Sequence, residues 1–188
     1  LFHYSRLGAN LASEYREVIN AYLQLSARKV LLVDFDNTLW SGVMAESEVV
    51  HDREAQSLLK EQQQAGILLV AVSKNDPRSI RWDEMVLSPE DFVSHKISWN
   101  PKPQSVEEVA HELELDPASF VLIDDNPVER SMVSSHLPAV AVMDGNDQRT
   151  WGRLRMMLGF PNTRQTAEAE RRTTMYREAV DRRQAVAG

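Results

Sequence analysis

The sequence of 188 residues contains no cysteine. It can therefore form no disulfide framework, no thiolate zinc site and no thiol nucleophile. The absence of cysteine fits a cytoplasmic protein, which is the location we expect. The five histidines include no pair spaced four residues apart on a predicted helix, so we interpret them as surface or core residues and not as metal ligands.

The sequence also lacks a long apolar run and an excess of basic residues. No run reaches the roughly 18 apolar residues of a membrane-spanning helix, so we expect no membrane partner. The net charge of −7 is unfavourable for nonspecific binding to nucleic acid. From Arg149 onward, nine arginines face four acids. We interpret this reversal as a solvated helical face, with a docking face for an acidic partner as the alternative.

Length and composition indicate a single domain. Hydrophobic residues make up 43% and charged residues 26% of the chain, as in globular proteins, and the length suits one well-formed core. We divide the chain into a connector helix over 1–27, a catalytic core over 28–148 and a helical extension over 149–188. Because the chain begins at Leu1 without methionine, we expect a piece of a longer polypeptide, joined upstream through its first helix.

Five short apolar runs alternate with segments of helical periodicity. Continuous apolar runs are typical of strands buried on both faces, and their alternation with helices predicts a parallel sheet. The predicted strands cover 29–35, 67–72, 92–97, 119–123 and 138–143. The predicted helices cover 5–25, 53–65, 77–85, 105–115, 151–158 and 166–183, the third of them poorly defined, and a further helix starts at 127. The fold class is therefore α/β, a Rossmannoid three-layer sandwich with a five-stranded, mainly parallel sheet.

Local signals place several helix ends. Asp52 and Asn126 are candidate N-cap residues, and a proline follows Asn126 at the first helical position. Gly66 is a C-terminal stop signal. Ser105 and Glu108 have the spacing of a capping box, which predicts a helix start at residue 105. Residues 41–50 carry no periodicity, and we predict an irregular segment there.

Polar side chains follow four of the predicted strands. Parallel strands place their carboxyl ends on one edge of the sheet, so we expect these side chains to converge. Each residue alone also fits an ordinary turn or helix N-terminus, but four such clusters in this order are difficult to explain structurally. The clusters are Asp34, Asp36 and Thr38; Ser73, Lys74 and Asn75; Lys102; and Asp124 and Asp125.

The acidic members of these clusters predict a magnesium site. Mg²⁺ prefers oxygen ligands and takes few protein carboxylates, leaving positions for substrate phosphate and water. We assign as metal ligands Asp34, Asp36 through its backbone carbonyl, and Asp124. Asp125 either joins them or orients Lys102.

The same residues predict phosphoryl transfer. A carboxylate held by a metal stays ionised and can attack phosphorus, and Asp34 is our candidate nucleophile. Asp36, two residues on, can protonate the leaving oxygen and then activate water. Ser73 can hydrogen-bond phosphoryl oxygens, and Lys102 can neutralise the charge on the transferring group.

Several strings of the sequence extend this pattern. They are residues 34–42 (DFDNTLWSG), 72–76 (VSKND), 99–102 (WNPK) and 123–130 (IDDNPVER), with a weaker match around 166–177. In these strings the sequence resembles the FkbH-like family of the haloacid dehalogenase (HAD) superfamily, over roughly residues 25–180. The resemblance implies a HAD-like fold, and the spacing of the motifs predicts minimal or no cap.

The resemblance implies an acyl-loading reaction. Such enzymes take a phosphorylated three-carbon acyl donor, typically 1,3-bisphosphoglycerate, and place the glyceryl or a related lactyl unit on the phosphopantetheine thiol of an acyl carrier protein in polyketide biosynthesis. Phe35 stands where glyceryl-loading members carry cysteine, so transfer here goes directly to the carrier thiol or through a carboxylate. The candidate substrate-binding residues are Thr38, Lys74, Asn75, Asn126 and Arg130.

Spacing predicts an open site. The intervals from Thr38 to Ser73 and from Ser73 to Lys102 are filled by the predicted helices and strands, which leaves no room for a large cap domain. Such a site suits a carrier-borne substrate or another macromolecular phosphate. Two alternatives stay open: an uncapped Mg²⁺-dependent phosphatase acting on another ester, and a non-catalytic module that docks carrier proteins.

Overall fold

A five-stranded sheet forms the centre of the computed structural model, which describes residues 4–160 and 166–187. The predicted segments 1–27 and 149–188 therefore both extend beyond the described residues. The strand order is β5-β4-β1-β6-β7, and every neighbouring pair is parallel. The strands are β1 (Val30–Val33), β4 (Leu68–Ser73), β5 (Phe92–Ile97), β6 (Phe120–Asp124) and β7 (Ala141–Asp144). This architecture confirms the predicted α/β Rossmannoid class.

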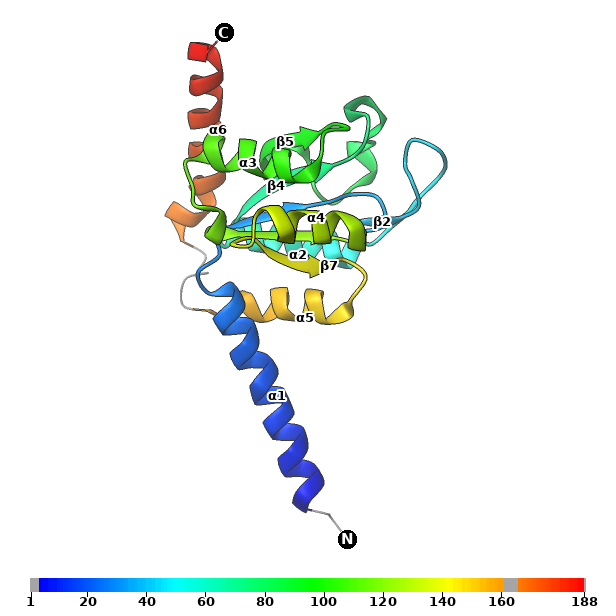
Figure 1. Ribbon diagram of the computed structural model, residues 1–188, viewed down its shortest axis with the longest axis vertical. Coiled ribbons are helices and arrows are strands. Elements are labelled where there is room, and N and C mark those ends of the chain that lie inside the picture. The colour runs from blue at the N-terminus through cyan, green and yellow to red at the C-terminus, as the bar shows by residue number, and fades with distance from the viewer. Residues whose placement is uncertain (1–3, 161–165, 188) are drawn as a thin grey trace.

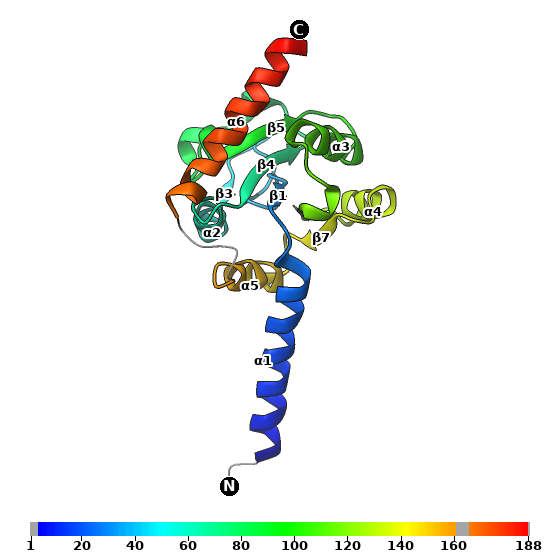
Figure 2. The same ribbon diagram turned by 90° about the vertical axis from the view of Figure 1, so that its left-hand side faces the viewer.

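Helices cover both faces of the sheet (Figures 1 and 2). One apolar cluster joins the sheet to α2 and α5, and a second joins the opposite face to α3 and α4. Three layers result, as the sequence predicts. The helices are α1 (Tyr4–Leu25), α2 (Arg53–Gln64), α3 (Lys102–Leu113), α4 (Pro127–His136), α5 (Gln148–Met157) and α6 (Ala167–Ala187).

The central strand β1 shows why the runs are continuous. Leu31 and Val33 belong to the α2–α5 side of the core, whereas Val30 and Leu32 belong to the α3–α4 side. All four side chains are fully buried. Burying one such side chain contributes about 1.5–3 kcal/mol, so the strand is held in register from both faces.

The cap signals have a mixed outcome. The side chains of Asp52 and Asn126 accept the predicted hydrogen bonds from the first turns of α2 and α4. The helix start predicted from the Ser105 capping box is wrong. Helix α3 begins three residues earlier, at Lys102, and Ser105 is buried inside it. Prolines at positions 101 and 103 favour this earlier start, since the first helical turn needs no backbone N–H donor.

Two connections differ from their predicted form. The segment predicted as irregular contains a hairpin, in which β2 (Trp40–Ser41) pairs antiparallel with β3 (Val50–His51). We refer to residues 40–51 as the flap. In place of a helix over 77–85 there are two separate 3₁₀ turns, η1 (Pro77–Ser79) and η2 (Trp82–Glu84). Two more such turns, η3 (Pro89–Asp91) and η4 (Pro117–Ser119), precede β5 and β6.

The two terminal helices differ in how they meet the three layers, because α6 packs on the sheet and places Val180 in the α3–α4 side of the core. Helix α1 projects away from the body (Figure 1), and Ala21 and Leu25 near its end are buried in the core. Helix α6 contacts β5, and its Arg172 donates a hydrogen bond to the carbonyl oxygen of Gly66 after α2. Among the described residues, no helix combines the length and the apolar character needed to cross a membrane.

Candidate active site

Three charged side chains meet at the carboxyl edge of the sheet. Asp34 directly follows β1, Asp124 ends β6, and Lys102 is the first residue of α3. The ammonium of Lys102 lies 2.9 Å from Oδ1 of Asp34 and also donates to Oδ2 of Asp124. All three side chains are buried. A buried charge is costly unless it is paired, and here one lysine is shared between two carboxylates.

The electrostatics of this group favour a bound cation. Burial raises the pKa of Asp34 to about 6, although Lys102 opposes the shift. Burial also raises the pKa of Asp125, and the charge of Asp124 adds to the effect. Burial alone would lower the pKa of Lys102, but its attraction to the two carboxylates raises it. Burial therefore disfavours the ionised form of these carboxylates, and a bound cation would offset that cost.

The donor set fits Mg²⁺. Asp34, Asp124 and Asp125 each offer an oxygen, and these oxygens lie within 4.8 Å of one another. With Lys102, the group carries a formal charge of −2. Oxygen ligands of this kind and number suit Mg²⁺, which takes few protein carboxylates and completes its shell with water and phosphate.

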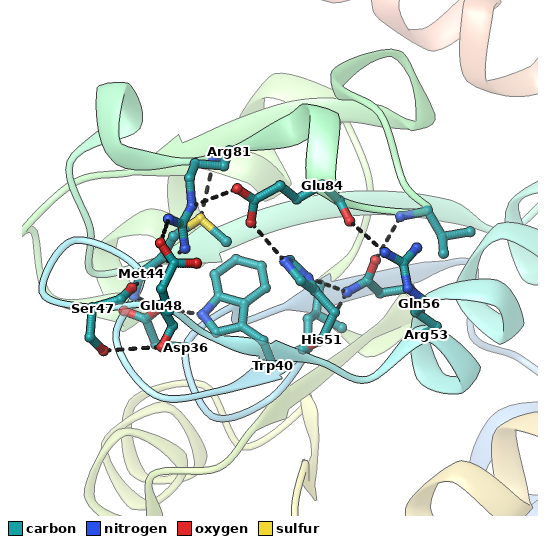
Figure 3. Close-up of polar contacts among 12 residues, drawn as sticks. Asp36, Trp40, Met44, Ser47, Glu48, His51, Arg53, Gln56, Arg81 and Glu84 are labelled. Atoms are coloured by element: carbon teal, nitrogen blue, oxygen red, sulfur yellow. Dashed lines mark hydrogen bonds and ion pairs between the residues drawn. The ribbon is translucent and has the colours of Figure 1, made fainter.

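The carboxylate of Asp36 lies outside this group of oxygens. Other donors hold it, among them Trp40 and Met44 (Figure 3). Its Oδ1 accepts hydrogen bonds from Nε1 of Trp40 at 2.7 Å and from the backbone N–H of Met44 at 3.1 Å. Its Oδ2 accepts one from Nδ2 of Asn75 at 2.9 Å. Only the backbone carbonyl was predicted as a metal ligand, and these contacts concern the side chain alone. The Trp40 contact was missed, although its spacing of four residues from Asp36 was visible in the sequence.

Ser73 and Thr38 are buried beside the three acids. The side chain of Ser73 lowers the pKa of Asp34 and so opposes part of the rise that burial causes. The Thr38 hydroxyl oxygen accepts a hydrogen bond of 3.1 Å from the backbone N–H of Asp125. A Cβ atom on Gly145 would lie 2.9 Å from that same hydroxyl oxygen, so the chain after β7 approaches closely because glycine is there.

The other predicted substrate residues make contacts within the protein. Lys74 pairs with Glu129 at 2.7 Å, and Asn126 caps α4. Arg130 donates to the carbonyl oxygen of Asp124 at 2.7 Å and pairs with Asp144 at 2.8 Å, which links the ends of β6 and β7. Their assignment to substrate stays a prediction.

The sequence matches no protein family model and no curated protein. It is similar to a solved structure of the N-terminal part of protein BF1531 from Bacteroides fragilis, which contains a phosphatase domain complexed with Mg. The identity is 28% and the TM-score 0.63, over 78% of this chain and 44% of that one. This chain therefore spans less than half the length of that relative.

Two further solved structures share the fold. One is a HAD family enzyme, BT-2542 from Bacteroides thetaiotaomicron, in complex with magnesium and inorganic phosphate (13% identity, TM-score 0.53, 66% of this chain and 98% of that one). The other is the 3-deoxy-D-manno-octulosonate 8-phosphate phosphatase from Moraxella catarrhalis, in complex with magnesium, phosphate and KDO. Its identity is 15% and its TM-score 0.50, over 90% of this chain and 98% of that one. Together the comparisons show a fold shared with Mg-bound phosphatase structures, one of them a HAD family enzyme, and do not reach the FkbH-like family.

Proposed function

We propose that this chain is a Mg²⁺-dependent phosphatase of the HAD type that works through a phosphorylated aspartate. The observation that carries the proposal is the buried contact of Lys102 with Asp34 and Asp124 at the carboxyl edge of a parallel sheet. Ligands bind at this edge in open α/β folds. The Mg-bound phosphatase domain of the Bacteroides fragilis protein supports the same chemistry.

Asp34 is the nucleophile in this proposal. Its carboxylate oxygen forms a bond to phosphorus while the bond from phosphorus to the leaving oxygen breaks, and Asp36 gives that oxygen a proton. Asp36 then takes a proton from a water molecule that attacks the phosphorus, which releases inorganic phosphate and restores Asp34. Lys102, which contacts Asp34, and the buried Ser73 at the end of β4 stabilise the charge of the transferring group.

The carboxylates of Asp34, Asp124 and Asp125 would hold Mg²⁺, and the backbone carbonyl of Asp36 is the predicted fourth ligand from the protein. When bound, the ion supplies positive charge that offsets the charge of the phosphoryl oxygens. Thr38 keeps Asp125 in place through the backbone N–H of that residue.

Phosphate release from p-nitrophenyl phosphate and from acetyl phosphate tests this proposal. We expect release that requires Mg²⁺ and is abolished in Asp34→Asn, which keeps the shape of the side chain and removes the nucleophile. Release that persists in Asp34→Asn would rule out the aspartyl-phosphate route.

A more specific form of the function is acyl loading, which rests on the FkbH-like strings and on the open site. A cap could sit in the connection from β1 to α2 or in the connection from β4 to β5. The elements there are the two flap strands in the first and short 3₁₀ turns in the second. We propose that a phosphorylated three-carbon acyl donor and the phosphopantetheine arm of an acyl carrier protein both reach Asp34 here. The chain would then act in the cytoplasm, as part of a larger polyketide synthase chain.

Intact-mass spectrometry of a phosphopantetheinylated carrier protein separates the two forms. The carrier is incubated with this chain, Mg²⁺ and enzymatically generated 1,3-bisphosphoglycerate, with Asp34→Asn as the control. A gain of one glyceryl unit that is lost in the variant supports loading without an enzyme cysteine. Phosphate release without a carrier mass change supports the plain phosphatase, or a lactyl donor. If neither occurs, the non-catalytic docking module is favoured.

A further inference from the structure

The carboxylate of Asp36 is an unusually constrained acceptor for a group proposed to move protons. Three donors reach it from three places: the indole of Trp40 at the start of the flap, the backbone of Met44 within the flap, and the amide of Asn75 after β4. Figure 3 shows the indole and the flap backbone converging on Asp36. Such contacts fix the rotation of the carboxylate as well as its position.

Counting lone pairs shows what this arrangement leaves available. Each carboxylate oxygen has two lone pairs that can accept hydrogen bonds. On Asp36, both lone pairs of Oδ1 are used by Trp40 and Met44, whereas one lone pair of Oδ2 is used by Asn75. One lone pair of Oδ2 therefore stays open for a proton.

We propose that Trp40 and Asn75 are positioning residues that restrict proton transfer by Asp36 to a single oxygen, Oδ2. This inference rests on the proposed function, because it assigns the atom through which Asp36 acts. In the first half of the reaction Oδ2 releases its proton to the leaving oxygen, and in the second half it takes one from the attacking water. Neither positioning residue touches the phosphoryl group in this role.

The surroundings of Trp40 make the indole a rigid donor. Its side chain is buried, and its ring packs against Phe35 at 5.4 Å and edge-on against His51 at 5.6 Å between ring centres. His51 is held in turn by the buried amide of Gln56 and by Glu84 (Figure 3). The indole N–H can therefore turn toward Asp36 only in one orientation.

The flap itself is fixed to η2, which keeps the second donor in place. The guanidinium of Arg81 pairs with Glu48 at 3.3 Å and donates to the backbone oxygen of Ser47. The backbone N–H of Arg81 donates to the sulfur of Met44 (Figure 3). The backbone N–H of Met44 thus reaches Asp36 from a flap that is braced at several points. The geometry at Oδ1 then depends on contacts well outside the carboxylate cluster.

Trp40→Phe tests the proposal, because it keeps an aromatic ring and removes only the donor. Trp82→Phe is the matched control, since Trp82, like Trp40, packs against Phe35, here edge-on with 5.6 Å between ring centres. Among the described residues, the donors to the Asp36 side chain do not include Trp82. Asn75→Ala removes the donor to the other oxygen and serves as a second, independent variant. Thermal melts of each variant serve as the check that it folds.

The readout separates positioning from general damage. With p-nitrophenyl phosphate and Mg²⁺, we expect kcat of Trp40→Phe to fall about tenfold to a hundredfold, as for partial loss of acid–base catalysis. KM should fall in step, so that kcat/KM and Mg²⁺ affinity stay unchanged. Nitrophenolate is a good leaving group that needs little protonation, so Trp40→Phe should show a burst approaching one nitrophenolate per enzyme followed by slow turnover. Asn75→Ala should behave likewise.

Two results would overturn the inference. One is a kcat of Trp40→Phe within twofold of Trp82→Phe, and the other is a loss of kcat matched by a loss of Mg²⁺ affinity, which indicates a disturbed site. Failure of the proposed function looks different: the wild-type chain then releases no phosphate from either p-nitrophenyl phosphate or acetyl phosphate, and this inference falls with it.

Discussion

Replacing Lys102 by methionine is the sharpest test of the charged cluster. The substitution keeps the length of the side chain and removes the ammonium that two carboxylates share. The Lys102 side chain is only 4% exposed, and those of Asp34 and Asp124 are 9% and 0% exposed. Water therefore compensates only poorly for the lost partner.

The expected magnitude follows from this burial. Breaking a buried ion pair from one side costs about 3–5 kcal/mol, because the remaining charge is left unpaired. For a chain of this length, each kcal/mol shifts Tm by roughly 2–4 °C. In EDTA we therefore expect Lys102→Met to melt roughly 6–20 °C below the wild type.

Mg²⁺ should reverse part of this loss. The substitution changes the formal charge of the group from −2 to −3, so the ion meets more negative charge and no competing ammonium. We expect Mg²⁺ to raise Tm more in Lys102→Met than in the wild type. A tenfold gain in Mg²⁺ affinity corresponds to about 1.4 kcal/mol of added stability at saturating ion.

Circular dichroism melts in EDTA and in a Mg²⁺ titration measure both effects. Lys60→Met is the control, because the Lys60–Asp91 pair is similar in kind but the lysine side chain is 36% exposed, and such pairs contribute at most about 1 kcal/mol. The reasoning is refuted if Lys102→Met melts within about 2 °C of Lys60→Met in EDTA, or if Mg²⁺ raises Tm equally in the wild type and in Lys102→Met.

Three further predictions concern other parts of the structure. In EDTA, Asp34→Asn should gain stability relative to the wild type as the pH rises from about 4 to about 6, and should keep that advantage at higher pH. The reason is that the pKa of Asp34 is about 6 in the folded state against 3.8 in the unfolded state, so ionisation in this range costs the wild type stability. Urea unfolding across this pH range measures the difference, and an advantage that shrinks with rising pH contradicts the prediction. Asp125→Asn should weaken Mg²⁺ binding, measured by calorimetry, at least tenfold. Asp36→Asn should leave the Mg²⁺ affinity within about threefold, since the Asp36 carboxylate faces other donors. Equal losses would show that both carboxylates bind the ion. Gly66→Ala should destabilise the fold by about 1–3 kcal/mol, because φ is +91° and the new Cβ would lie 2.9 Å from Cβ of Ala169; an unchanged urea midpoint would show that α6 does not pack there.

The strands and the acidic edge could be predicted because they depend on local composition. A run such as Leu68–Val72 is apolar throughout, so periodicity alone identifies a strand buried on both faces. The start of α3 was misplaced because the Ser105 spacing and the Pro101 position compete. The proline signal prevailed, and it set Lys102 at the helix N-terminus beside Asp34.

The contacts of individual polar side chains were beyond the reach of the sequence. The bond from Trp40 to Asp36 requires the chain to turn back after β1, and no turn signal distinguishes the flap from a disordered loop. Arg130 is a candidate substrate residue in the sequence because it ends the string IDDNPVER that carries the family resemblance. Its bonds to Asp124 and Asp144 depend on β7 lying beside β6, which only the folded sheet provides.

The placement of the charged residues separates the source of stability from the source of function. Within β1, β4 and β6, the polar residues are Ser73 and Asp124, and each is the last residue of its strand. The apolar interior supplies the free energy of folding, and it allows the chain to tolerate two buried carboxylates around one lysine. Such a group opposes stability when empty and is relieved by a cation, so metal binding and folding stability should change together. This coupling is why the melts of Lys102→Met bear on function as well as on packing.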